Sequence, residues 1–108
     1  MYKRFICLIM FSVVFSQTTG KISGVVKDKS DSSSLPGANV YLENTSFGSA
    51  SDEQGRFTLI NIPPGKYILK VDMIGYKSVK MENIIVSVNR TFSLDLELEQ
   101  TVIEGEVV

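Results

Sequence analysis

The chain has 108 residues, enough for one small domain, and its composition of 44% hydrophobic and 21% charged residues excludes an intrinsically disordered protein. Eleven basic residues against twelve acidic ones give a net charge of −1, which excludes a basic nucleic-acid-binding protein. The chain contains no histidine, the commonest general base and metal ligand. We therefore expect no catalytic residue, no metal and no cofactor.

The first residues have the composition of a secretory signal peptide. Lys3 and Arg4 supply a positive start, and an almost entirely apolar stretch follows over residues 5–15. This stretch is about half as long as the ~20 apolar residues that a membrane-spanning helix requires, which argues against the alternative of a membrane anchor. A buried helix is a further alternative, but the polar exit disfavours it. We predict that residues 1–16 are removed by a cut before Gln17 and that the protein is exported.

After Gly20 nearly every segment alternates between apolar and polar residues with a period of two, which is typical of strands with one buried face. No window shows the 3.6-residue periodicity of a helix. The pattern predicts an all-β fold, an antiparallel seven-stranded β-sandwich. The expected strands cover residues 22–27, 38–43, 56–59, 67–73, 78–82, 84–88 and 92–99.

Turn-forming residues separate these segments. Residues 30–37 are polar and end in Pro-Gly, and residues 52–55 suit a type I turn with Gly55 in the left-handed conformation. Residues 63–65 contain two prolines, which lack the amide donor of a β-ladder. Gly75 predicts a bend or bulge in a long strand.

Five strand and turn motifs follow one another along the chain: Ile22–Val26 with Asp28, Leu35–Val40, Asp52–Phe57, Ile62–Tyr67 and Ile74–Tyr76. In this order and at these spacings they resemble the carboxypeptidase regulatory-like domain. The resemblance covers Gly20 to about Leu98 and implies a transthyretin-like or Ig-like sandwich.

In bacterial envelope proteins such a domain commonly follows the signal peptide of TonB-dependent outer-membrane receptors. The resemblance therefore implies a domain over residues 17–99, an exit linker over residues 100–108 leading to a TonB box or plug, and a location in the periplasm or outer membrane. The implied partners are a C-terminal plug and barrel, or periplasmic envelope proteins. Two alternatives remain open: a carbohydrate-binding module and the regulatory domain of a peptidase.

Two aromatic residues are candidates for contacts with a carbohydrate or a protein partner. Tyr41 shares its strand face with polar neighbours and Phe47 lies in a polar loop, so both rings are expected to be exposed. Tyr67 and Tyr76 fall on the apolar register and are expected to pack in the core.

The exit linker holds a second set of candidates, Val102, Ile103 and Glu104. An extended segment of this kind offers unpaired backbone groups, which a periplasmic partner could bind by adding the segment to a sheet edge. The alternative is that the segment pairs with an edge of its own domain.

Three acidic residues, Asp28, Asp52 and Glu53, are the strongest metal-ligand candidates. A Ca²⁺ ion requires about six to eight oxygens, whereas a four-residue turn offers two or three. We therefore interpret these carboxylates as turn-stabilising groups.

Overall fold

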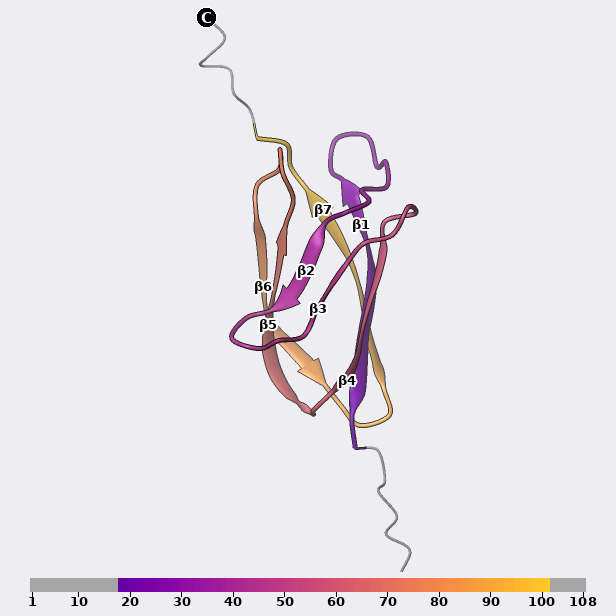
Figure 1. The fold of residues 1–108 in the computed structure, drawn as a ribbon, viewed down its shortest axis with the longest axis vertical. Helices are drawn as coiled ribbons and strands as arrows, with labels where there is room; N and C mark the ends of the chain where they lie inside the picture. Colours follow the sequence, from indigo (N-terminus) through magenta and orange to yellow (C-terminus); the bar gives the residue numbers. More distant parts are fainter. Residues whose placement is uncertain (1–17, 102–108) are drawn as a thin grey trace, which may run out of the picture.

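The computed structural model describes residues 18–101, and in this range the chain forms seven strands and no helix (Figure 1). Strands β4, β1 and β7, in that order, make one sheet, and β3, β2, β5 and β6 make the other. The strands are β1 (Gly20–Asp28), β2 (Asn39–Leu42), β3 (Gly48–Ala50), β4 (Arg56–Ile62), β5 (Gly65–Asp72), β6 (Val79–Val86) and β7 (Thr91–Leu98).

The two sheets enclose one apolar core, which confirms the predicted all-β sandwich. The predicted alternation places the correct side chains inside: Leu69 and Val71 are fully buried, while Lys70 between them is half-buried. The other buried core residues are Ile22, Val26, Leu35, Ala38, Val40, Leu42, Phe57, Leu59, Ile62, Ile84, Val86, Leu96 and Leu98.

The expected and observed strands agree in number but not in membership. The short strand β3 was not predicted, because its three small residues Gly-Ser-Ala carry no alternation. The segments 78–82 and 84–88, predicted as two strands, form the single strand β6, which ends at Val86 and leaves Val88 exposed.

Two β-bulges explain why alternation changes phase inside two of the strands. Between the pairs Ile22↔Leu59 and Gly20↔Ile62, strand β4 contains one residue more than β1, and Asn61 in this extra step has a φ of 57°. Strand β6 has an equivalent β-bulge at Asn83, which has a φ of 62°. Asparagine tolerates this left-handed conformation better than most residues. After each bulge, the apolar side chains of the strand again point into the core.

Four of the five strand pairings are antiparallel, as predicted, but β1 and β7 pair in parallel over eight residue pairs, from Lys21↔Thr91 to Asp28↔Leu98. The chain crosses from β6 into the other sheet at the end where β1 begins, so β7 must run in the same direction as β1. Parallel neighbours need a long connection, and here strands β2 to β6 provide it. As a result β1 begins at one end of the sandwich and β7 finishes at the other (Figure 1).

Two glycines permit close backbone approaches that a side chain would prevent. A Cβ at Gly24 would collide with the carbonyl oxygen of Leu94 and with the ring of Phe57. Gly55 has a φ of 76° and its N–H donates to the Asp52 carbonyl at 2.8 Å, as expected for the predicted turn over residues 52–55.

Candidate interaction surface

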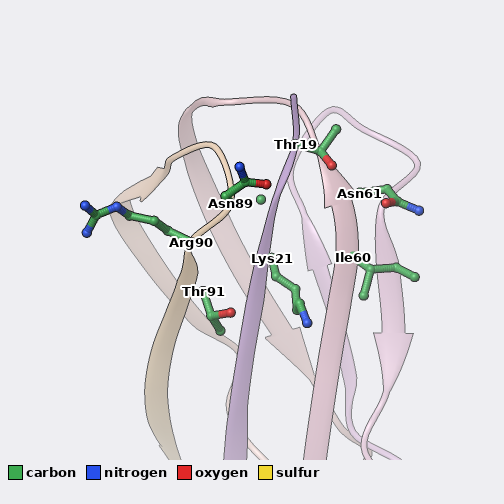
Figure 2. Close-up of a pocket in the computed structure, with 8 residues that line it drawn as sticks. Thr19, Lys21, Ile60, Asn61, Asn89, Arg90 and Thr91 are labelled. Atoms are coloured by element: carbon green, nitrogen blue, oxygen red, sulfur yellow. The ribbon is translucent and has the colours of Figure 1, made fainter. Parts of the chain in front are cut away.

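An open hollow of about 280 Å³ lies at the end of the sandwich where β1 begins (Figure 2). We call it the entrance hollow. It is bordered by the start of β1, the bulged end of β4 and the turn that precedes β7. Its lining consists of Thr19, Gly20, Lys21, Ile60, Asn61, Asn89, Arg90 and Thr91.

Backbone hydrogen bonds hold the borders of the entrance hollow together. The Lys21 N–H donates to the Arg90 carbonyl at 3.0 Å, and the Asn89 N–H donates to the Thr19 carbonyl at 2.9 Å. Asn61 and Asn89 both adopt left-handed conformations, which bend the chain at the rim. The hollow is therefore a fixed feature of the fold, although its sides come from segments far apart in the sequence.

The side chains around the entrance hollow combine positive charge with exposed apolar surface. Lys21 and Arg90 are exposed, and Ile60 in β4 has 56% of its surface accessible. A surface of this kind suits an anionic partner with apolar groups. Sequence reasoning missed this surface because strand pairing, rather than chain order, brings its residues together.

At the opposite end, the carboxylate of Asp28 joins three segments of the chain. It is only 2% exposed and accepts hydrogen bonds from the Ser30 N–H (2.7 Å) and hydroxyl (2.6 Å), the Tyr76 hydroxyl (2.7 Å) and the Gln100 side-chain amide (3.0 Å). The donors, first the Ser30 hydroxyl and then Tyr76 and Gln100, hold the pKa of Asp28 well below its usual value, against the opposing effect of burial. Both carboxylate oxygens are thereby used inside the fold, and we call this group the Asp28 clamp.

The chain beyond β7 is attached to the turn between β5 and β6. Gln100 forms an isolated antiparallel bridge with Tyr76, the Lys77 N–H donates to the Glu99 carbonyl at 2.8 Å, and the Thr101 N–H donates to the Gly75 carbonyl at 3.0 Å. Gln100 and Thr101, the first two residues of the expected exit linker, are thus in contact with this turn. The candidates Val102, Ile103 and Glu104, like the expected leader 1–16, lie outside the described residues.

The two candidate aromatic residues are half-buried, not exposed as expected, and they do not line the same depression. The Tyr41 hydroxyl donates to Asp72 Oδ2 at 2.9 Å, and this hydrogen bond raises the pKa of Tyr41. Phe47 is half-buried against the core and lines a shallow groove with Thr58 and Ile60, to which Tyr41 does not contribute. Carbohydrate binding by these rings stays a prediction. The contacts of Tyr76 and Tyr67 agree with the expected core roles, since both pack on the core cluster.

The carboxylate of Asp52 stabilises the turn that contains it, as we interpreted it from the sequence. Asp52 Oδ1 accepts the N–H groups of Gln54 at 2.9 Å and Arg56 at 2.8 Å, and the Arg56 hydrogen bond is the main cause of the lowered pKa of Asp52. Within residues 18–101, no group of three or more Cys, Asp or Glu side chains could hold a metal ion. In the same range no helix is long and apolar enough to cross a membrane.

Comparison with known proteins identifies the family. Residues 22–108 match the family model of the CarboxypepD_reg-like domain. The chain belongs to this family. Among curated proteins, this CarboxypepD_reg-like domain is similar to the TonB-dependent receptor P3 of Formosa agariphila, with 27% identity over 104 residues. That match covers 96% of this chain but only 10% of the receptor, so the chain spans about a tenth of the relative's length.

Solved structures show the same fold at low sequence identity. A chain of a type II cohesin–X–dockerin complex from Acetivibrio cellulolyticus is 18% identical with a TM-score of 0.65, over 80% of this chain and 62% of that chain. The major pilin subunit BcpA of Bacillus cereus is 23% identical with a TM-score of 0.59, over 78% and 31%. A 3-chlorocatechol 1,2-dioxygenase from Rhodococcus opacus is 14% identical with a TM-score of 0.54, over 80% and 61%. A fold shared by such different proteins does not determine activity.

Proposed function

We propose that this CarboxypepD_reg-like domain is a non-catalytic accessory domain of the bacterial envelope. It stands at the N-terminus of a TonB-dependent outer-membrane receptor and serves interaction or spacing between the receptor and its periplasmic partners. The observation that carries this proposal is the match to the receptor from Formosa agariphila, which extends over 104 of the 108 residues and therefore includes most of the leader. A leader followed directly by this domain is the arrangement expected at the start of an exported receptor.

The geometry of the domain supports a spacing role. Because β1 and β7 are parallel, the chain enters at one end and leaves at the other, and the eight residues of β7 separate these ends by about 26 Å. The Asp28 clamp and the bridge between Tyr76 and Gln100 fix the direction in which the chain leaves. A partner held at the entrance hollow would therefore sit at a defined distance from whatever follows Thr101.

The described acidic groups with shifted pKa values support a structural rather than a catalytic role. Asp28, Asp52 and Asp72 all have lowered pKa values because they accept hydrogen bonds from neighbouring turns or strands. A general acid or base needs a pKa near the working pH, and these shifts move the carboxyl groups away from it.

Processing and location test this proposal together. The whole chain, expressed in a Gram-negative host, should be recovered from the periplasm with its N-terminus at or near Gln17, as read by N-terminal sequencing. The coding sequence beyond Val108 should encode a plug and a barrel. An intact Met1 in the cytoplasm would argue against export, and a peptidase downstream would favour the alternative of a peptidase regulatory domain.

A further inference from the structure

We propose that the entrance hollow is the docking site for an extended, acidic and apolar segment of a periplasmic partner protein. The compartment of the partner rests on the proposed function, whereas its chemistry is argued from the surface alone. The groove lined by Phe47, Thr58 and Ile60, which we call the Phe47 groove, shares Ile60 with the hollow, and we take it as a second part of the same site.

The distribution of charge between the two ends of the domain favours an acidic partner. Residues 18–23, 59–69 and 84–94 meet at the entrance end through the β1–β4, β1–β7 and β5–β6 pairings. Together they contain three basic residues and no acidic one, whereas the rest of the described chain contains six basic and ten acidic residues. An acidic segment is therefore attracted to the entrance end and repelled from the exit end.

Exposed apolar residues gather at the same end. Of the four large hydrophobic residues that are exposed in the described chain, Ile60, Ile85 and Val88 belong to these segments. Exposed apolar side chains beside cations also occur on lipid-binding surfaces. Here, however, Ile60 lines two depressions, the entrance hollow and the Phe47 groove, and does not lie on a protruding tip. Side chains of a polypeptide can enter such depressions, whereas a flat bilayer contacts protruding residues.

The backbone of β4 gives a reason for an extended conformation. Strand β4 is the edge of its sheet, so one side of its backbone has no neighbour within that sheet. The bulge at Asn61 ends regular pairing with β1 next to the hollow. An extended segment lying along this edge can use backbone hydrogen bonds for affinity. Lys21 on the neighbouring strand β1 and Arg90 just before β7 add the positive charge that attracts acidic side chains to this end of the domain.

A peptide with the sequence of residues 101–108 is a suitable probe, because it has two glutamates, four aliphatic residues and no basic residue.

The test is a fluorescence-anisotropy titration of the labelled peptide with the exported chain. We expect saturable binding that weakens with salt, and an affinity at least about tenfold lower for Lys21→Glu and Arg90→Glu. Lys80→Glu makes the same charge change on the exposed face of the other sheet and should alter the affinity less than about twofold. A peptide with both glutamates replaced by glutamine should bind about tenfold more weakly, and Ile60→Ser should also weaken binding.

Several outcomes would overturn the proposal. These are no saturable peptide binding, an equal loss in Arg90→Glu and Lys80→Glu, or binding to anionic phosphatidylglycerol vesicles in place of the peptide. Self-association of the chain alone in sedimentation, abolished by Arg90→Glu, would assign the hollow to a second copy and not to a partner. Thermal unfolding of each variant shows that it is folded. Because the titration uses purified protein, its failure leaves the localisation test of the proposed function unaffected.

Discussion

Replacing Leu69 by alanine tests the assignment of the buried face on the central strand β5. Leu69 is fully buried and pairs with Leu42 on one side and Met81 on the other. The change removes three carbon atoms, which at about 0.8 kcal/mol each gives about 2.4 kcal/mol of lost transfer free energy. The residual cavity adds to this loss, so we expect a decrease of about 3 kcal/mol in the free energy of unfolding.

Lys70→Ala is the matched control on the opposite face of the same strand. The Lys70 ammonium lies 3.9 Å from Glu43 in a partly exposed ion pair, so its removal should change the free energy of unfolding by less than about 0.5 kcal/mol. Urea denaturation followed by circular dichroism gives both values. With an m-value of about 1 kcal/mol/M, Leu69→Ala should lower the urea midpoint by about 3 M. A larger loss in Lys70→Ala would mean that the face assignment is wrong by one residue.

Three further predictions concern the clamp, the bulge and the exit. Because hydrogen bonds keep the pKa of Asp28 well below its usual value, its stabilising contribution is complete above about pH 4, the pKa region of an unfolded aspartate, and is lost as the pH falls further. Asp28→Asn should therefore flatten the decline of Tm between about pH 5 and pH 2, and an unchanged slope in calorimetry would contradict the clamp. Asn83→Val should destabilise the domain by about 1–2 kcal/mol because a β-branched residue is strained at positive φ, whereas Asn83→Gly should be tolerated in the same urea assay. In hydrogen exchange, the amide of Thr101 should be protected like the amides of β7, while residues 102–108 exchange fast. Tyr76→Phe should remove the protection of Thr101, and the control Tyr67→Phe should leave it unchanged. Equal protection from residue 91 to residue 108 would mean that the exit segment is a structural strand.

Local pattern was a sound guide to the fold wherever one face of a strand is buried. The buried positions Leu69 and Val71 and the turn at Gly55 can both be predicted from the sequence. Period-two burial and a left-handed glycine depend only on residues that are close together in the chain. The strand β3 was missed because Gly48–Ala50 has too little side chain to carry a pattern. The phase change at Asn83 was read as a break between strands, although a single left-handed residue restores the register.

The candidate site was less accessible to sequence reasoning. Lys21, Ile60 and Arg90 are separated by about 30 residues or more, and only the pairing of β1 with both β4 and β7 brings them together. The absence of acidic residues from the three contributing segments was visible in the sequence, but its meaning required the topology. Asp28 was considered as a metal ligand, since the donors Tyr76 and Gln100 could not be assigned to it from chain order.

The parallel pairing of β1 with β7 also determines how the domain responds to mechanical tension. A pull that draws Thr19 and Thr101 apart along the strand axis slides β7 past β1, so the interstrand hydrogen bonds over eight residue pairs are loaded at the same time. Pulling on an adjacent antiparallel pair from its shared end, such as Gly20 and Ile62, instead opens the bonds one after another. Rupture under force is governed by the rate of unfolding rather than by equilibrium stability. The topology thus makes this small cysteine-poor domain resistant to stretching between its two ends, a resistance that requires no covalent cross-link.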